Sequence, residues 1–162
     1  MSDAADTPGI VAARAAGIPF EVMRTQRARS AEESAGFQGI ELGRLLRTIV
    51  VRRGADEYVF VLVPGGRRID WAKLRAHLGI RRISLPDKDE AFEATSYERG
   101  AITPFGSSHA WPVIADTTVG AAGDPVAIGG GAHGVNLHVA TADLLRATNA
   151  TVADVTEPDS VD

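Results

Sequence analysis

The stretch LLRTIVVRRGADEYVFVLV, residues 45–63, contains two apolar runs joined by a short polar turn. Side chains alternate along residues 45–53, which predicts a strand with Arg47 on an otherwise apolar face. Residues 57–63 predict its hairpin partner after the turn at residues 54–56. Because both faces of the pair are largely apolar, we expect the hairpin to lie centrally in a sheet that is covered on both sides.

Short helices and further strands surround the hairpin in the sequence. Capping residues such as Thr7, Ser30, Asp70 and Asp87 precede segments with helical periodicity. We expect helices at residues 8–16, from 31 to Gly36 or Gly39, at 71–78, 87–95 and 141–147, and strands at 20–24, 82–85, 111–115, 125–128 and 135–139. This order predicts one α+β domain, over residues 1–150, with a mixed, mostly antiparallel sheet and flanking helices.

Composition excludes several classes of protein. The chain has 162 residues, no cysteine and no apolar run long enough to span a bilayer. A disulfide-held fold and a thiol nucleophile are therefore excluded. The first residues have neither the basic segment nor the apolar segment of a signal peptide, so we expect a cytoplasmic protein without a membrane partner.

The net charge of −4 hides an uneven distribution of charge. Six acidic residues and no basic ones lie in residues 1–6 and 151–162, and we expect residues 151–162 to form an acidic, mobile tail. The remainder holds 15 acidic and 17 basic residues, and 15 of the basic residues are arginine, whose planar guanidinium suits phosphate. This charge permits RNA binding without arguing for it, and we expect no DNA partner.

The segment ERGAITPFG, residues 98–106, places two glycines and a proline within seven residues. Glycine allows close backbone approach and proline fixes one dihedral angle, so the loop is stiff and can present peptide N–H groups to a ligand. An ordinary turn between two elements fits the same composition.

The pattern Gly100-x-x-x-Pro104-Phe105-Gly106 resembles the Gly-x-x-x-Pro loop of the YbaK family, relatives of the editing domain inserted in bacterial prolyl-tRNA synthetases. The likeness runs from about Thr7 to Leu145. It implies a sheet curled into a partial barrel and a free-standing deacylase that hydrolyses wrongly aminoacylated tRNA. The implied amino acid is small, such as Ala, Ser, Thr or Cys, and tRNA-Pro and an aminoacyl-tRNA synthetase are the implied partners.

Arg47 opens the first strand of the hairpin, and it has two interpretations. An arginine among apolar neighbours is costly unless it reaches a partner, or extends over the sheet edge to solvent. In the YbaK family, a Lys-Thr or Lys-Ser pair opens this strand and its lysine helps to hold the substrate. The pair here is Arg47-Thr48, and arginine retains the charge but cannot give up its proton. The resemblance therefore implies that Arg47 and Thr48 bind substrate.

The run GGGAHG, residues 129–134, matches the Gly-x-Gly-x-x-Gly fingerprint of dinucleotide-binding folds. That fingerprint requires a helix to follow, whereas residues 135–139 have the alternation of a strand, so we reject a nucleotide site. A tight turn and a close approach to a ligand both remain open. The resemblance makes Gly130 and Gly131 candidate pocket residues, and His133 a candidate substrate contact.

The other polar residues carry weaker signals. Ser107 and His109 approach a serine nucleophile elbow, but Trp111-Pro112 prevents the helix that an elbow must enter. The four histidines have no paired spacing, so we expect neither a metal nor a cofactor. The predicted substrate contacts also include residues of lower specificity: Phe20, Ile102, Pro104 and Phe105. Asp116 directly follows a predicted strand and fits a turn or capping residue. The YbaK family often has an acid there, so the resemblance also makes Asp116 a candidate substrate contact.

An aminoacyl ester is activated, so its hydrolysis requires positioning and oxyanion stabilisation more than a strong nucleophile. We expect the backbone N–H groups of Gly100, Ala101 and the 130–131 turn to supply this stabilisation, with Arg47 assisting and Ile102 and Phe105 as pocket walls. Two alternatives remain: a non-catalytic module that binds an aminoacyl-adenosine end, and an interaction domain that binds no RNA.

Overall fold

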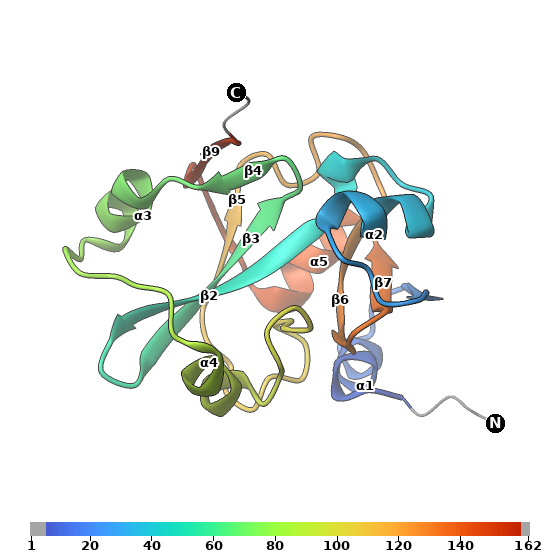
Figure 1. Ribbon diagram of the computed structural model, residues 1–162, viewed down its shortest axis with the longest axis horizontal. Helices are drawn as coiled ribbons and strands as arrows, with labels where there is room; N and C mark the ends of the chain where they lie inside the picture. The colour runs from blue at the N-terminus through green and yellow to red at the C-terminus, as the bar shows by residue number, and fades with distance from the viewer. Residues whose placement is uncertain (1–5, 160–162) are drawn as a thin grey trace.

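The computed structural model describes residues 6–159 (Figure 1). The helices are α1 (Pro8–Ala15), α2 (Ala31–Gln38), η1 (Leu42–Arg44, 3-10), α3 (Trp71–Leu78), α4 (Lys88–Thr95) and α5 (Thr141–Thr148). The strands are β1 (Glu21–Arg24), β2 (Leu46–Gly54), β3 (Glu57–Pro64), β4 (Arg67–Ile69), β5 (Val113–Asp116), β6 (Val126–Ala132), β7 (Val135–Val139), β8 (Thr151–Ala153) and β9 (Thr156–Pro158).

The strands form three sheets, in the orders β2-β3-β5-β8, β1-β7-β6 and β4-β9. The β3–β5 and β5–β8 pairs are parallel and the other pairs are antiparallel, which confirms the predicted α+β domain with a mixed, mostly antiparallel sheet. A bridge between Leu45 and Ala127 brings the start of β2 beside β6. The two larger sheets thus meet at this end without closing into a barrel.

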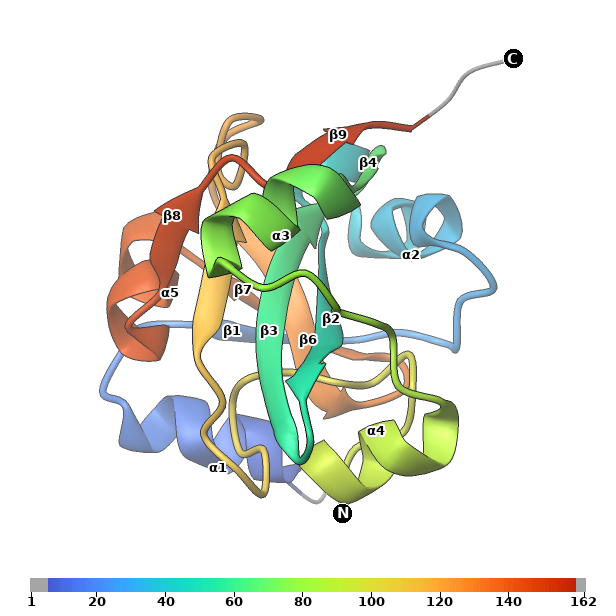
Figure 2. The same cartoon turned by 90° about the vertical axis from the view of Figure 1, so that its left-hand side faces the viewer.

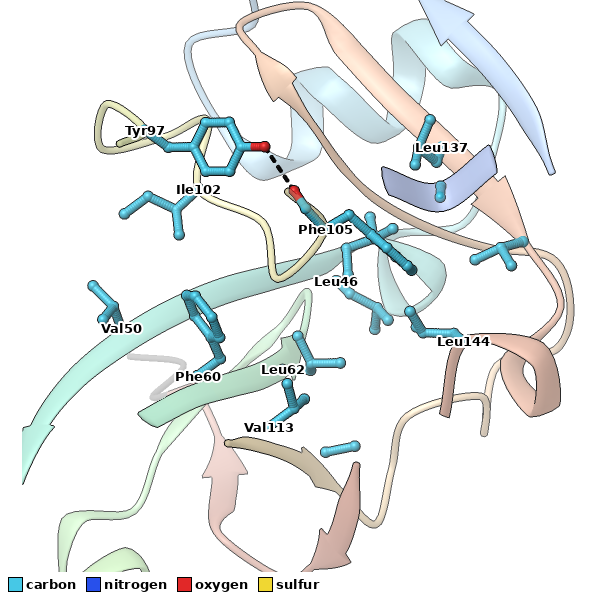
Figure 3. Close-up of a cluster of buried hydrophobic side chains, with 14 of the residues drawn as sticks. Leu46, Val50, Phe60, Leu62, Tyr97, Ile102, Phe105, Val113, Leu137 and Leu144 are labelled. Carbon is cyan, nitrogen blue, oxygen red and sulfur yellow. Dashed lines mark hydrogen bonds between the residues drawn. The ribbon is translucent and has the colours of Figure 1, made fainter. Parts of the chain in front are cut away.

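Strand β3 is central and buried on both faces, as predicted for the hairpin, whereas β2 is the edge strand of its sheet and is only partly buried. Phe60 and Leu62 pack into one apolar cluster, and Val61 and Val63 pack into a second cluster on the opposite face. All four side chains are at most 1 % exposed. Figure 3 shows the first cluster, in which Leu46 of β2 lies near the residues of β3. The alternation that predicts two strands therefore also divides the core in two.

The predicted helix starts are confirmed by side-chain caps. Thr7, Ser30, Asp70 and Asp87 each accept a hydrogen bond from a backbone N–H in the first turn, at 2.8 to 3.1 Å. Helix α5 begins after Ala140 without a side-chain cap. Each α-helix in residues 6–159 is eight residues long, and none is long enough to cross a membrane.

The C-terminal segment is ordered as far as Pro158, which corrects the prediction of a mobile tail from residue 151. Strand β8 pairs with β5, and β9 pairs with β4 (Figure 2). Val155, between the two strands, is fully buried. The acidic composition obscured these three-residue strands, whose pairing depends on partners distant in sequence. The last part of the predicted tail, residues 160–162, lies outside the described residues.

Candidate functional site

A cavity of about 400 Å³ opens where the start of β2, helix α2 and the β6–β7 turn meet the loop of residues 98–106, called the Gly100 loop below. Its floor includes Leu46 and Ile102, which also belong to the apolar core shown in Figure 3. The lining residues are Thr25, Gln26, Arg27, Ala28, Arg29, Ser30, Ala31, Ser34, Leu45, Leu46, Arg47, Thr48, Ile49, Arg99, Gly100, Ala101, Ile102, Gly129, Ala132, His133, Gly134, Val135 and Asn136.

The cavity brings together half of the predicted site residues, although they come from three separate parts of the chain. These residues are Arg47, Thr48, Gly100, Ala101, Ile102 and His133. The His133 ring lies directly against Gly100, since a Cβ added to Gly100 would approach His133 Cε1 to 3.1 Å. Gly100 also has φ of 92°, a conformation that side chains rarely adopt. Both facts explain a glycine at this position.

The other predicted residues do not line this cavity. The Phe105 side chain is buried in the core, and Phe20 packs against the same core. The Gly130 carbonyl accepts a hydrogen bond from Thr7 Oγ1, and Gly131 lies against Gly9 and Tyr97. These contacts hold α1 and the Gly100 loop against β6. The half-buried Pro104 likewise lies away from the cavity lining.

Asp116 is a structural residue in this fold, at the end of β5, and it also lies away from the cavity. Its carboxylate accepts hydrogen bonds from the Thr118 N–H at 3.0 Å, the Thr118 hydroxyl and the Val155 N–H at 2.9 Å. Burial raises the pKa of Asp116, but these hydrogen bonds outweigh burial and leave the pKa below its ordinary value. The carboxylate therefore holds the C-terminal segment in place.

The Gly100 loop is fixed at both ends. The Tyr97 hydroxyl donates to the Phe105 carbonyl at 2.6 Å, the dashed line in Figure 3, and burial raises the pKa of Tyr97 to about 12. Within the loop, the Ala101 N–H donates to the Glu98 carbonyl at 2.9 Å, so it is not available as an oxyanion donor. Among residues 6–159, the N–H groups of Gly100 and Ile102 have no acceptor. These two groups replace Ala101 as candidate donors.

Arg47 is exposed at the rim of the cavity and is not buried among the apolar side chains of its strand. Its guanidinium donates to the Arg67 carbonyl at the start of β4. Both interpretations of Arg47 therefore hold in part, because its side chain has a polar partner and is also exposed to solvent. The guanidinium has further N–H groups, since arginine carries five donors.

The lining of the cavity is strongly cationic. Four arginines contribute to it and no aspartate or glutamate does. The exposed side chains of Arg27 and Arg29 form no ion pair within the described part of the chain, whereas Arg99 donates to the Pro86 carbonyl at 2.9 Å. The prediction from the sequence missed Arg27 and Arg29. The feature of the sequence that could have identified them is the cluster of three arginines in residues 24–29, immediately before the cap of α2.

Thr48 provides the clearest chemical sign of a ligand. Its Oγ1 is inaccessible to solvent and has no hydrogen-bond partner among the described residues. A buried hydroxyl without a partner costs roughly 1 to 3 kcal/mol, and such groups occur mainly where a water or a ligand completes them. No group of three or more potential metal ligands occurs within residues 6–159.

The model of the aminoacyl-tRNA editing domain family matches residues 25–147, which include every residue lining the cavity. The chain belongs to this family. The match confirms the resemblance seen in the Gly100-x-x-x-Pro104 loop.

Individual relatives agree with this assignment. The chain is 32 % identical over 96 residues to a proline–tRNA ligase of Thermosipho melanesiensis, covering 59 % of this chain and 17 % of the ligase. It is 27 % identical to the protein named "Putative Cys-tRNA(Pro)/Cys-tRNA(Cys) deacylase EbsC" of Enterococcus faecalis, covering 78 % and 77 % of the two chains. This chain thus spans a small part of the ligase and most of the Enterococcus protein.

Solved structures show the same fold. The hypothetical protein APE2540 superposes with a TM-score of 0.81 at 26 % identity, covering 89 % of this chain and 95 % of the other. A protein described as a "putative trans-editing enzyme for prolyl tRNA synthetase" superposes with a TM-score of 0.84 at 24 % identity, covering 95 % and 99 %.

Proposed function

We propose that this editing-domain protein hydrolyses the ester bond of a wrongly aminoacylated tRNA, acting in trans as a free-standing deacylase. The observation that carries the proposal is the cavity beside Gly100, which combines unpaired hydrogen-bond donors with four arginines and no carboxylate. Such a lining suits an anionic, oxygen-rich ligand. The 3′ end of a charged tRNA has this chemistry, with phosphates on one side of the terminal adenosine and an ester on the other.

The reaction requires few groups from the protein. Water attacks the ester carbonyl carbon, and negative charge develops on the carbonyl oxygen. If the neighbouring 2′-hydroxyl attacks first, the acyl group only moves to the 2′-oxygen, and water must still attack that ester. The N–H groups of Gly100 and Ile102 stabilise this oxyanion. Thr48 orients the ester or the water once a rotation of its side chain brings Oγ1, which is inaccessible in the described conformation, to the cavity. When the bond to the ribose oxygen breaks, that oxygen takes up a proton. The products are a free amino acid and a tRNA with its 3′ end restored.

The proposed substrates carry a small amino acid. Ile102 and Leu46 limit the space at the floor of the cavity, and editing sites select by size where a synthetase cannot. The names of the relatives support Cys-tRNA(Pro) as one candidate, and Ala, Ser and Thr are comparable in size. A prolyl-tRNA synthetase is the proposed partner, since related domains are part of proline–tRNA ligases.

A panel of tRNA-Pro molecules charged with Ala, Ser, Thr, Cys or Pro tests this proposal. We expect at least one small non-cognate ester to be hydrolysed well above its rate in buffer, while Pro-tRNA-Pro is spared. If no ester in the panel is cleared faster than in buffer, the assignment of tRNA-Pro substrates fails.

The contact of Arg47 favours a second candidate function, a module that binds the aminoacyl-adenosine end without hydrolysing it. The Arg47 guanidinium is engaged with the Arg67 carbonyl, and an arginine cannot transfer a proton. Arg47→Lys separates the two candidates. For a deacylase that uses arginine, we expect kcat/KM to fall about fivefold, because the donors to Arg67 and to the substrate cannot both be kept. A large gain in turnover would instead identify a binding module derived from an enzyme.

A further inference from the structure

A series of hydrogen-bonded polar side chains leads from His138, on the face of β7 opposite the apolar core, through helix α2 to the cavity. His138 Nε2 lies 2.9 Å from Gln38 Oε1, and Gln38 Nε2 donates to Ser34 Oγ at 2.9 Å. His138 is 9 % exposed and Gln38 is 5 % exposed, while Ser34 lines the cavity. In Figure 1, α2 lies over the sheet that contains β7. No step of the proposed reaction uses these three residues.

The hydrogen bonds in this chain have a defined direction. Burial lowers the pKa of His138, although Glu21 opposite it on β1 acts in the other direction, so the imidazole is neutral and carries one N–H. Because the Gln38 amide group donates to Ser34, the Gln38 carbonyl faces His138 and accepts from its Nε2–H. Each side chain therefore donates to the next, toward the cavity.

The last donor in this hydrogen-bonded series has no acceptor among residues 6–159. Ser34 Oγ accepts from Gln38, which leaves its own hydrogen free. A serine within a helix commonly donates to the carbonyl four residues earlier, but Ser34 forms no such bond to Ser30 among the described residues. The Ser34 hydroxyl is thus a polarised donor on the α2 wall of the cavity.

We propose that Ser34 donates a hydrogen bond to an oxygen of the terminal aminoacyl-adenosine and that Gln38 and His138 orient this donor. The identity of the ligand rests on the proposed function, whereas the direction of the hydrogen bonds from His138 to Ser34 rests on the geometry alone. Ser34 from α2 and Thr48 from β2 both line the cavity that would hold this substrate. If these three side chains served only to fill space, apolar residues at their positions would be equally stabilising, since burying polar groups carries a desolvation cost.

Gln38→Glu is the decisive variant because it changes the direction of donation with almost no change in shape. An ionised glutamate can only accept, so the Ser34 hydroxyl must turn toward residue 38 and no longer donates to the ligand. Ser34→Ala removes the same donor, and Ser34→Thr keeps it. Thermal unfolding of each variant shows whether the fold is retained.

Binding is measured by calorimetry with 3′-deoxy-3′-(L-alanylamino)adenosine, whose amide replaces the labile ester. We expect Gln38→Glu and Ser34→Ala each to raise Kd about fivefold to tenfold, the double variant to match either single variant, and Ser34→Thr to bind as the native protein does. Native-like binding by Gln38→Glu overturns the orienting role, and native-like binding by Ser34→Ala overturns the contact. If the native protein does not bind this probe, the proposed ligand fails as well.

A second measurement needs no ligand. Long-range ¹H–¹⁵N spectra at neutral pH should show His138 as the neutral tautomer with its proton on Nε2. A proton on Nδ1 would reverse the order of hydrogen-bond donation between His138 and Ser34. It would overturn the proposed direction even if deacylation of mischarged tRNA had been observed.

Discussion

Two polar clusters lie at different places in this domain, and they differ in whether their hydrogen bonds are complete. Around Asp116, each carboxylate oxygen accepts from a neighbouring donor, and Arg67 donates to Thr156 at 2.7 Å. Around Gly100, the Thr48 hydroxyl has no partner and two backbone donors lack acceptors in the described chain. The complete cluster stabilises the fold, and the incomplete cluster has the chemistry of a binding site.

The largest expected effect is on stability, at the complete cluster. Asp116→Asn replaces one accepting oxygen with a donor, which then faces either the Thr118 or the Val155 N–H. We expect the free energy of unfolding to fall by about 3 kcal/mol, measured by urea denaturation. The folded fraction should keep its deacylase activity. A loss of kcat/KM without a loss of stability would show that Asp116 acts in the functional site and is not only structural.

The same carboxylate predicts a dependence of stability on pH. The folded-state pKa of Asp116 lies below its unfolded value, so its contribution is present above the unfolded pKa and is lost as the pH falls through the folded pKa. The native protein should therefore lose more stability than Asp116→Asn between about pH 5 and pH 2. Parallel stability curves for the two proteins would contradict this assignment.

A matched pair of threonine substitutions should give opposite results at the two clusters. Thr48→Val removes a hydroxyl without a partner, so we expect stability to be unchanged or higher and kcat/KM to fall about tenfold. Thr156→Val removes the acceptor of the Arg67 Nε–H, so we expect a loss of about 1 to 2 kcal/mol with kcat/KM unchanged. Denaturation and single-turnover deacylation would measure both quantities. Equal effects of the two variants on stability would remove the distinction between the clusters.

A smaller effect is expected from the arginines at the cavity. Replacing Arg27 and Arg29 with glutamine should raise KM for a charged tRNA several-fold and reduce the slope of log affinity against log salt by about 0.7 for each lost phosphate contact. Hydrolysis of 3′-O-alanyladenosine, which lacks phosphates, should not change. Arg68→Gln is the control, because Arg68 is exposed and paired with Glu157 at 3.1 Å. Equal losses with both substrates would show that the two arginines do not bind phosphate.

Local patterns explain what could be predicted from the sequence. Alternation along residues 45–63 predicts the hairpin and the two buried faces of β3, and capping side chains predict four helix starts. The Gly100-x-x-x-Pro104 pattern predicts the family and one wall of the cavity. These features depend on neighbours within a few residues of one another.

The remaining features depend on contacts between distant segments. Arg27, Arg29 and Ser34 line the cavity, and Gln38 of α2 contacts His138 of β7, 100 residues later in the chain; no spacing in the sequence reveals this arrangement. The resemblance places Asp116 in the site, whereas its carboxylate bonds to the N–H of Val155, 39 residues later in the chain. The same contact explains why residues 151–158 are ordered despite their acidic composition.

The account depends most on the unpaired donors beside Gly100 being completed by the substrate. Amide resonances of the protein, recorded with and without 3′-deoxy-3′-(L-alanylamino)adenosine, test this directly. We expect the N–H signals of Gly100 and Ile102 to move downfield and their hydrogen exchange to slow, while the Ala101 N–H, already bonded to Glu98, changes little. Binding of the analogue with the Gly100 and Ile102 signals unchanged would contradict the proposed oxyanion site.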